Sequence, residues 1–293
     1  MRVGLVDIGS NTVVLVIYKV ESLEEMPITI RHESNAVRLV DYIQDQHMDK
    51  EGIEKAAAVL AEYKKILEEA DIKEYYAFIT EPARNIDNYE EMHQRFLEEG
   101  FDVQALSGQE EAEFDFLGSQ LSYHEISTGN AFDIGGGSTE LITFKDHQIV
   151  EAVSIPYGCV RLSEMPLSKQ LVDSILSNTF NQHPTLHSNR NSVLIGIGGT
   201  CRATYKMMDA LHHTGTKFPV EYAKRLYDNL LHKNPSTLKV LQETLNKNRQ
   251  QVFLPGLNML LAIAKVFDAK EIQFSQGCVR EGFLYHKIKN SSK

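Results

Sequence analysis

Apolar residues recur along this chain with two different periods, which predict a mixture of helices and strands. Between residues 50 and 70 they fall at three- and four-residue spacing, which indicates a long amphipathic helix. Its apolar face is expected to carry Ile53, Ala57, Leu60, Tyr63 and Leu67. Shorter apolar runs at residues 3–7 and 13–20 are typical of buried strands.

The rest of the chain continues this alternation. Further strands are predicted at residues 28–32, 75–80, 103–106, 131–134, 140–144, 149–155, 193–196 and 272–274. Further helices are predicted at residues 89–98, 109–121 and 279–289, and most of the chain beyond residue 160 is expected to be helical. Strands and helices mixed in this way predict an α/β fold.

A polar segment, LSYHEISTGN at 121–130, separates two halves that share a motif. We place the first domain at 1–124 and the second at 125–293, with the last helix able to pack back on the first domain. Asp7-Ile8-Gly9 in the first half resembles Asp133-Ile134-Gly135 in the second. In each half an apolar strand ends at this motif, turns on small residues and returns. We therefore expect duplicated halves that face each other across a cleft.

Three glycine-containing loops are candidates for binding phosphate. Their residues are Gly9, Ser10, Asn11 and Thr12 in the first, Gly135, Gly136, Gly137, Ser138 and Thr139 in the second, and Gly198, Gly199 and Thr200 in the third. Small residues leave backbone N–H groups uncovered, and successive N–H groups can form a concavity that binds anions. Neither a Walker loop nor a complete dinucleotide fingerprint is present. Ordinary turn chemistry is the commoner explanation of any single loop, but it is disfavoured as the explanation of all three together.

Acids and an arginine accompany these loops. Asp133, Glu140 and Asp7 are candidate magnesium ligands, although an aspartate at a turn more commonly caps the backbone. Glu111 lies near the start of a predicted helix, where carboxylates stabilise the helix dipole. Glu111 also falls three residues before Phe114, on a face expected to carry Leu117 and Leu121 as well, so it is a candidate general base for water. Arg84 follows a strand and can bind phosphate or form a surface ion pair.

Composition narrows the class of protein. Hydrophobic content of 42% and charged content of 24% are typical of a globular protein. No apolar run approaches the roughly 20 residues that cross a bilayer, and the chain opens on a strand-like segment, so we expect no membrane association and a cytoplasmic location. The three cysteines form no CxxC pair, which argues against a disulfide framework or a zinc cluster.

Charge is unevenly distributed. The net charge is -10, with 12 Lys and Arg against 30 Asp and Glu in residues 1–150, and 18 against 10 in residues 151–293. An acidic chain is a poor general binder of nucleic acid, so no nucleic-acid partner is expected. The asymmetry indicates either two differently solvated surfaces or a second half that supplies positive potential to an anionic ligand.

Taken together, the motifs resemble those of the exopolyphosphatase / guanosine pentaphosphate phosphohydrolase (Ppx/GppA) family, within the actin-like ATPase superfamily. The matching segments are VDIGSNT at 6–12, TEPARNIDN at 80–88, SGQEEAEFDFLG at 107–118, FDIGGGSTEL at 132–141, YGCVRL at 157–162, GIGGTCR at 196–202 and QGCVREGFL at 276–284. The resemblance implies two ribonuclease-H-like domains with the active site in the interdomain cleft. It also implies magnesium-dependent hydrolysis of the terminal phosphate of polyphosphate or of the 5′ γ-phosphate of guanosine pentaphosphate.

The resemblance assigns roles to individual residues. Glu111 matches the catalytic glutamate that activates water, and Asp133 and Glu140 match metal-associated acids. The three loops match turns that bind phosphate. Arg84 and Asn88 keep the family's Arg-x-x-x-Asn spacing and are expected near substrate phosphates, and Arg280 matches an Arg-Glu-Gly motif near the C-terminus.

Two residues depart from the family pattern. Val14 stands where the family often has Arg or His, so one cationic contact is expected to be missing. Glu81 replaces the serine of the common Ser-Ala-x-Arg and adds negative charge near the expected anion path. The chain is also short, and it is expected to lack the extra helical domains with which long members grip polyphosphate.

The first hypothesis is a Mg²⁺-dependent exopolyphosphatase, with Mn²⁺ as an alternative metal. Guanosine pentaphosphate phosphohydrolase is the alternative among enzymes, because nothing in the sequence distinguishes the two substrates. A regulatory protein that binds nucleotide or polyphosphate without turnover is the alternative of another class, and the departures at Val14 and Glu81 favour it slightly. A sugar or acetate kinase is less favoured, because Glu111 and its helix fit hydrolysis. A homodimer is also considered.

Overall fold

The computed structural model of this protein describes residues 1–84, 86–190 and 193–291. These residues form two compact units. The first comprises Met1–Glu111 and the segment from Arg280 onward, and the second comprises Ala112–Val279. The chain therefore passes between the units twice, once in helix α3 (Gly108–Ser122) and once at the start of helix α10 (Val279–Ser291). The polar segment at 121–130 follows the first of these passages.

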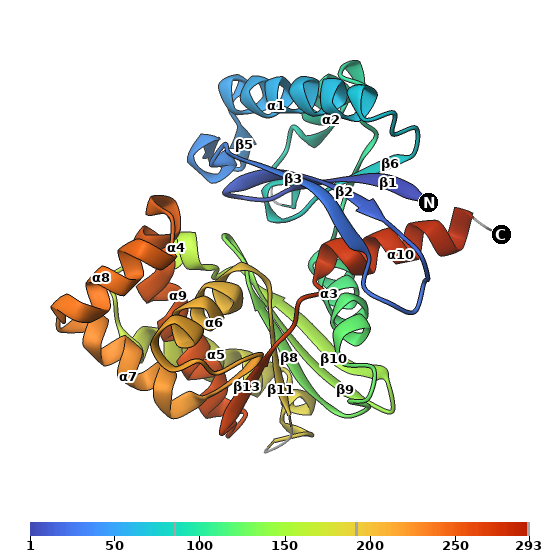
Figure 1. Ribbon diagram of the computed structural model, residues 1–293. Helices are drawn as coiled ribbons and strands as arrows, with labels where there is room; N and C mark the ends of the chain where they lie inside the picture. Colours follow the sequence, from blue (N-terminus) through green and yellow to red (C-terminus); the bar gives the residue numbers. More distant parts are fainter. Residues whose placement is uncertain (85, 191–192, 292–293) are drawn as a thin grey trace. The chain divides into compact units, whose positions relative to one another are not determined.

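The first unit is built on one five-stranded sheet (Figure 1). Its strands are β1 (Arg2–Ile8), β2 (Thr12–Lys19), β3 (Ile28–Ala36), β6 (Tyr75–Ile79) and β7 (Val103–Ala105). They lie in the order β3-β2-β1-β6-β7, with β1, β2 and β3 antiparallel and β6 parallel to both β1 and β7. The first unit also contains two helices, α1 (Lys50–Glu69) and α2 (Tyr89–Glu98). It is completed by the short hairpin of β4 (Ile43–Gln44) and β5 (His47–Met48) and by the 3-10 turns η1 (Leu39–Tyr42) and η2 (Glu81–Ala83).

Both faces of this sheet are covered, which explains the nearly continuous apolar runs of β1 and β2. All five residues predicted for the apolar face of α1 are buried, and that face packs with Val6 and Ile8 of β1 in one cluster. Helix α10 packs on the opposite face, where the rings of Phe78 and Phe283 lie 4.8 Å apart (Figure 1). Val14, on β2, is 7% exposed and is paired with Asp7 of β1.

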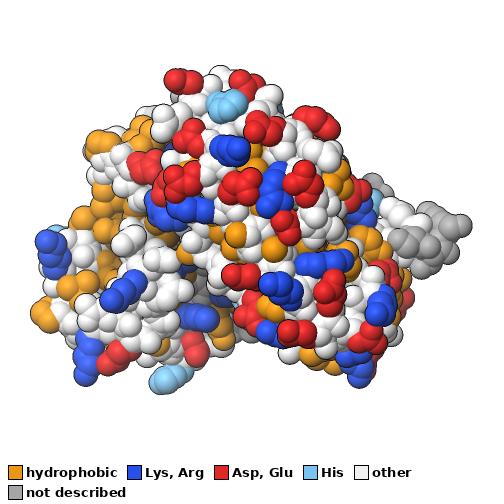
Figure 2. Space-filling model, turned by 90° about the horizontal axis from the view of Figure 1, so that it is seen from above, with side chains coloured by type: hydrophobic (Ala, Val, Ile, Leu, Met, Phe, Trp, Pro, Cys, Tyr) orange, Lys and Arg blue, Asp and Glu red, His pale blue; other side chains and the backbone are white. Residues whose placement is uncertain are grey.

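The outer face of α1 and α2 is a surface of paired charges. Figure 2 shows acidic and basic side chains interspersed on this side of the first unit. Arg95 of α2, for example, lies 3.2 Å from Glu54 of α1 and 2.7 Å from Glu99. Exposed pairs of this kind contribute little to stability. They fit the interpretation of the acidic first half as a solvated surface.

The second unit repeats the strand order of the first. Its strands are β8 (Gly129–Ile134), β9 (Thr139–Lys145), β10 (Gln148–Ile155), β11 (Leu194–Ile197), β12 (Lys217–Pro219) and β13 (Glu271–Phe274). The order is β10-β9-β8-β11-β13-β12, with three antiparallel strands followed by two parallel ones, as in the first unit, and β12 added antiparallel at the edge. The duplicated α/β architecture predicted from the two Asp-Ile-Gly motifs is therefore confirmed.

Helices cover the sheet of the second unit (Figure 1). They are α4 (Cys159–Ser163), α5 (Lys169–Gln182), α6 (Gly198–His212), α7 (Val220–Leu231), α8 (Pro235–Thr244) and α9 (Lys247–Val266), with the 3-10 turn η3 (Pro184–His187). Within the described residues, no helix combines the length and the apolar character needed to span a membrane.

One detail of α3 differs from the expectation. Leu117 is 44% exposed and does not share the buried face of Phe114. Phe114 itself is buried, and the buried positions of α3 also include Asp115, whose carboxylate accepts a hydrogen bond from the backbone N–H of Val279 at 2.8 Å. A buried carboxylate with such a partner can occupy a position that hydrophobic periodicity assigns to the surface.

Candidate functional site

The first Asp-Ile-Gly motif forms a tight hairpin turn in the first unit. The backbone N–H of Gly9 donates to the carbonyl of Thr12 at 2.9 Å, and among the described residues the N–H groups of Ser10 and Asn11 bond to no acceptor. Gly9 does not have a positive φ, and a Cβ there would meet only the Thr12 carbonyl at 3.5 Å. Neither strain nor packing requires glycine at this position. Its absent side chain leaves the amide face of the turn uncovered.

The second motif forms the same turn in the second unit. Gly135 donates to the carbonyl of Ser138 at 3.0 Å, and the N–H groups of Gly136, Gly137 and Ser138 find no acceptor in the described part of the chain. Positions correspond one to one between the two turns, so Asp133 matches Asp7. The amides uncovered in both turns form the kind of concavity that binds phosphate oxygens.

A close backbone approach holds the second turn in place, and sequence reasoning missed it. The first N–H groups of α4 donate to the turn, from Cys159 to Gly135 at 2.8 Å and from Val160 to Gly136 at 2.9 Å. Gly158, which precedes α4, lies so close that a Cβ there would be 2.3 Å from the Gly136 carbonyl oxygen. The segment YGCVRL contains Gly158, but only its glycine hinted at such a contact.

The third loop lies against Asp133 in the same unit. Gly198 has a φ of 69°, and a Cβ there would be 2.0 Å from Asp133 Oδ1. Thr200 donates its hydroxyl to the carbonyl of Ile134 at 2.7 Å, so its side chain ties β8 to α6. Thr200 is 1% exposed, and its predicted contact with phosphate stays a prediction.

Arg249 of α9 adds a cation that sequence reasoning did not identify. Its guanidinium lies over Gly199, since a Cβ at Gly199 would be 2.6 Å from Arg249 Nη2, and Nη1 lies 3.8 Å from the thiol of Cys159. Burial raises the pKa of Cys159, while Arg249 and a hydrogen bond with Thr200 oppose this rise. The positive net charge of residues 151–293 was the only indication of such a residue in the sequence.

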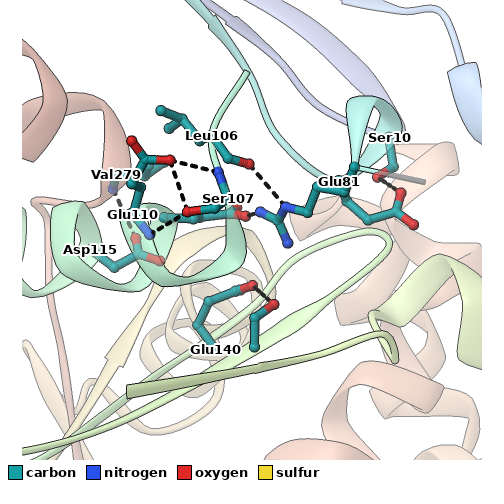
Figure 3. Close-up of polar contacts among 11 residues, drawn as sticks. Ser10, Glu81, Leu106, Ser107, Glu110, Asp115, Glu140 and Val279 are labelled. Carbon is teal, nitrogen blue, oxygen red and sulfur yellow. Dashed lines mark hydrogen bonds and ion pairs between the residues drawn. The ribbon is translucent and has the colours of Figure 1, made fainter. Parts of the chain in front are cut away.

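Asp133 and Glu140, the predicted magnesium ligands, lie in the second unit. They are directly opposite each other on β8 and β9, and both are buried, at 8% and 0% exposed. Glu140 accepts a hydrogen bond from Ser154 at 2.7 Å (Figure 3). No group of three or more His, Cys, Asp or Glu suited to a metal occurs among the described residues. Magnesium is commonly held by one or two carboxylates together with water and substrate phosphates, so this pair fits the metal.

Asp7 has different surroundings. Its partner across the hairpin is Val14, so the first unit lacks the second carboxylate of the Asp133–Glu140 arrangement. Burial raises the pKa of Asp7 to about 6, Arg280 lowers it from a distance of 4.0 Å, and Glu281 raises it. Magnesium binding by Asp7 stays a prediction.

Arg84 and Glu111, which the sequence singles out separately, meet in the first unit. The guanidinium of Arg84 contacts the carboxylate of Glu111, and their side chains are 15% and 12% exposed. Arg84 Nε also donates to the carbonyl of Leu106 at 3.1 Å (Figure 3). The dipole-stabilising role falls to the neighbouring Glu110, which accepts from the N–H and the hydroxyl of Ser107, both at 2.8 Å, in a capping box. Glu111 is thereby left to face Arg84.

Three other predicted residues are engaged within the protein. Asn88 bonds to both the N–H and the carbonyl of Met48 at 3.0 Å, so its amide side chain extends the β5 strand. Asn11 accepts at its carbonyl from the N–H of Arg38 at 3.0 Å. Ser10 donates its hydroxyl to Glu81 at 2.9 Å. The predicted phosphate contacts of these three residues stay predictions, as does the cleft between the domains. Asn85, of the TEPARNIDN segment at 80–88, lies outside the described residues.

Two sheets of one strand order, each opening on an Asp-Ile-Gly hairpin, define the two-domain fold of the actin-like ATPase superfamily. The model of the Ppx/GppA phosphatase family matches residues 16–291, and the chain belongs to this family. The match begins just beyond the first turn, whose assignment therefore depends on its correspondence with the second.

Similar proteins carry names that are consistent with membership of this family. A guanosine-5'-triphosphate,3'-diphosphate pyrophosphatase of Pseudoalteromonas atlantica is 26% identical over 97% of this chain and 58% of its own length. Exopolyphosphatase 1 of Mycobacterium tuberculosis is 32% identical over 56% of this chain and 48% of its own length. The chain thus spans about half the length of these relatives. A putative exopolyphosphatase of Haemophilus influenzae is 24% identical over 99% of this chain and 92% of its own length.

Solved structures agree on the fold. The Ppx/GppA family member of Aquifex aeolicus is 23% identical with a TM-score of 0.80, and the comparison covers 100% of this chain and 99% of that one. An exopolyphosphatase of Cytophaga hutchinsonii is 22% identical with a TM-score of 0.84, covering 99% of this chain and 98% of that one.

Proposed function

We propose that this protein is a Mg²⁺-dependent hydrolase that removes the terminal phosphate of inorganic polyphosphate. The observation that carries the proposal is the contact between Arg84 and Glu111. The fold brings together a cation suited to a phosphoryl oxygen and a carboxylate suited to accept a proton from water, and both are largely shielded from solvent.

The residues of the second unit would hold the phosphates. The uncovered amides of Gly136, Gly137 and Ser138 would donate to phosphoryl oxygens, and Arg249 would add a charge-assisted hydrogen bond. Asp133 and Glu140 would hold the metal, which neutralises charge that develops on the phosphoryl group. Mn²⁺ is the alternative occupant of this carboxylate pair.

The residues of the first unit would activate the water. Glu111 would take one proton as the water oxygen bonds to the terminal phosphorus, and the bond from that phosphorus to its bridging oxygen would break. The products are orthophosphate and a chain shorter by one phosphate, which leaves with the bridging oxygen. Arg84 would orient Glu111 and share its charge between that carboxylate and the phosphoryl oxygens.

Guanosine pentaphosphate is the second candidate substrate. The Pseudoalteromonas relative, which matches 97% of this chain, is named for a substrate of this kind. A cytoplasmic location and homodimer formation stay predictions.

The test is phosphate release measured side by side on polyphosphate and guanosine pentaphosphate, with and without Mg²⁺. Glu111→Gln should lower turnover about 10²- to 10⁴-fold, the usual contribution of a general base. Glu113→Gln, at an exposed position of the same helix, is the matched control and should retain turnover. Binding of either substrate with no release under any metal would instead support a regulatory binding protein.

A further inference from the structure

A cavity that the phosphate chemistry does not use lies among three helices of the second unit. Helices α5 and α7 both pack against α9 (Figure 1), and the cavity that they line together with the segment before β13 has a volume of about 720 Å³. Cavities of roughly 300–1,000 Å³ commonly bind small molecules. Along α9, Asn258 of the cavity follows Arg249 by nine positions, which is about 14 Å of helix. The cavity is therefore separate from the third loop, over which Arg249 lies.

Two buried polar side chains that line this cavity have hydrogen-bonding capacity that the protein leaves unused. Tyr227 of α7 is 2% exposed, and among the residues that the structure describes its hydroxyl makes no hydrogen bond. Asn258 is 4% exposed, and its Nδ2 donates to the carbonyl of Ser168 at 3.3 Å, while its Oδ1 accepts no hydrogen bond in the described part of the chain. Buried polar groups normally have partners, and leaving one unpaired is costly. A hydroxyl and an amide oxygen are thus left for a ligand.

The hydroxyl of Tyr227 stays protonated at neutral pH. Burial raises the pKa of Tyr227, and the charge of Asp228 raises it further. The ammonium group of Lys169 lies 4.7 Å from the centre of the Tyr227 ring, a contact that holds this lysine beside the cavity. The hydroxyl can therefore donate a hydrogen bond to a ligand as well as accept one.

The charged residues that line the cavity balance one another, because four lysines are matched by four acidic residues. Two of the pairs are closed by hydrogen bonds, Lys265 with Asp173 at 2.8 Å and Lys270 with Asp268 at 3.2 Å. A polyphosphate chain, which carries only negative charge, would meet as many carboxylates as ammonium groups here. The cavity therefore favours a ligand without net charge.

The other two pairs leave their hydrogen-bonding groups available. Lys169 lies 3.9 Å from Asp228, and Lys224 lies 3.9 Å from Glu221, which is longer than a hydrogen bond. Because Glu221 also lies 3.7 Å from Arg225, the pair of Lys169 and Asp228 is the more available of the two. This pair presents an ammonium group beside a carboxylate. An amino acid carries the complementary charges next to each other, so one molecule can bind both members of the pair.

We propose that this cavity binds a zwitterionic amino acid whose side chain is apolar along its length and ends in a hydroxyl, as that of tyrosine does. Lys169 would donate to the carboxylate of the ligand, and Asp228 would accept from its ammonium group. The ligand side chain would lie against the apolar part of the lining, which includes Leu261. Its hydroxyl would donate to Asn258 Oδ1 and accept from Tyr227. This site is independent of the proposed function.

The test is calorimetry on the full chain with three ligands that differ by one group. L-Tyrosine carries every recognised group, L-phenylalanine lacks the hydroxyl, and tyramine lacks the carboxylate. The parent should bind L-tyrosine about tenfold more tightly than either analogue, because each analogue leaves a charged or buried group of the site unpaired. An excess of tripolyphosphate should not displace L-tyrosine.

Two variants assign the contacts. Tyr227→Phe should weaken binding of L-tyrosine about tenfold and change that of L-phenylalanine less than about twofold, since only L-tyrosine has a hydroxyl that loses its partner. This variant should not destabilise the unliganded protein, in which the hydroxyl has no protein partner. Lys169→Met, at a largely exposed position, should weaken L-tyrosine about tenfold and tyramine less than about twofold. Tyr222→Phe, on the same helix but not lining the cavity, is the matched control and should change no affinity.

Each contrary result would overturn the inference. One is the absence of L-tyrosine binding up to its solubility limit, and another is equal affinity for L-tyrosine and L-phenylalanine. Affinities unchanged in both variants would place the ligand outside this cavity, and displacement by tripolyphosphate would place it in the phosphate site. The proposed function is tested separately, because binding here requires no phosphate release and phosphate release requires no ligand in this cavity.

Discussion

Gly198→Ala tests whether the third loop holds Asp133 in the position required of a metal ligand. Gly198 has a φ of 69°, which costs an L-residue about 1–2 kcal/mol. An added Cβ would also lie 2.0 Å from Asp133 Oδ1 and 2.2 Å from Oδ2, well inside any non-bonded contact. The carboxylate must therefore move, and its displacement adds a further cost of about 1–3 kcal/mol, typical of overpacking.

Gly215→Ala supplies the matched control within the same unit. Gly215 has a φ of 65°, almost the same as that of Gly198, but a Cβ there would meet nothing within 4 Å. Its substitution should cost only the backbone term, about 1–2 kcal/mol. The difference between the two variants isolates the collision with Asp133 from the strain that both share.

Urea unfolding and Mg²⁺-dependent phosphate release are the two measurements. Gly198→Ala should lose about 1–3 kcal/mol more apparent unfolding free energy than Gly215→Ala. It should also require more Mg²⁺ for half-maximal release, whereas Gly215→Ala keeps the parent's requirement. Equal stability losses and unchanged Mg²⁺ requirements would refute the argument, because they would mean that Asp133 does not depend on the absent side chain of Gly198.

Three further predictions concern charged residues and the second turn. Burial raises the pKa of Asp7 from 3.8 to about 6, so ionisation of Asp7 costs stability as pH rises through this range. In EDTA, Asp7→Asn should therefore stabilise the protein by up to about 3 kcal/mol at pH 7.5 and should not stabilise it at pH 4. An equal gain in stability at both pH values would contradict this. Arg249→Met should raise the KM for polyphosphate about tenfold or more, as loss of a charge-assisted hydrogen bond predicts, and an unchanged KM would remove Arg249 from the phosphate site. Gly158→Ala should lower turnover at least tenfold by displacing the Gly136 peptide, and parent-like turnover would show that the turn tolerates this displacement.

Local pattern was sufficient to predict most elements of the fold. Helix α1 was predicted within one residue at its end, because a 20-residue amphipathic pattern leaves little ambiguity, and α2 was predicted at its observed bounds. The two-residue strands β4 and β5 were missed because they are too short to carry a period, and the three-residue strand β12 was missed as well. Strand β3 extends to Ala36 and not only to His32, because it pairs along the whole of β2, and this pairing compensates for its polar sequence.

Long-range contacts set the limit for predicting the site. The two hairpin turns could be predicted because each is made of adjacent residues with a shared motif. The buried Asp115 accepts a hydrogen bond from Val279, which lies 164 positions further along the chain. The contact of Arg249 with Cys159 spans 90 positions, and that of Ser10 with Glu81 spans 71. The spacing of residues that are close in the sequence cannot predict such pairs.

The duplicated hairpins place one local structure in two different surroundings. Both turns close with the same hydrogen bond and leave their amides uncovered, so both can face phosphate. They differ at the position opposite the shared aspartate, which is Val14 in the first unit and Glu140 in the second. A second carboxylate on the hairpin suits the second turn to a metal, whereas the residue opposite Asp7 on the first hairpin is the apolar Val14. The first unit carries instead the contact between Arg84 and Glu111, so substitutions there should alter water activation more than the metal requirement, and substitutions of Glu140 should do the reverse.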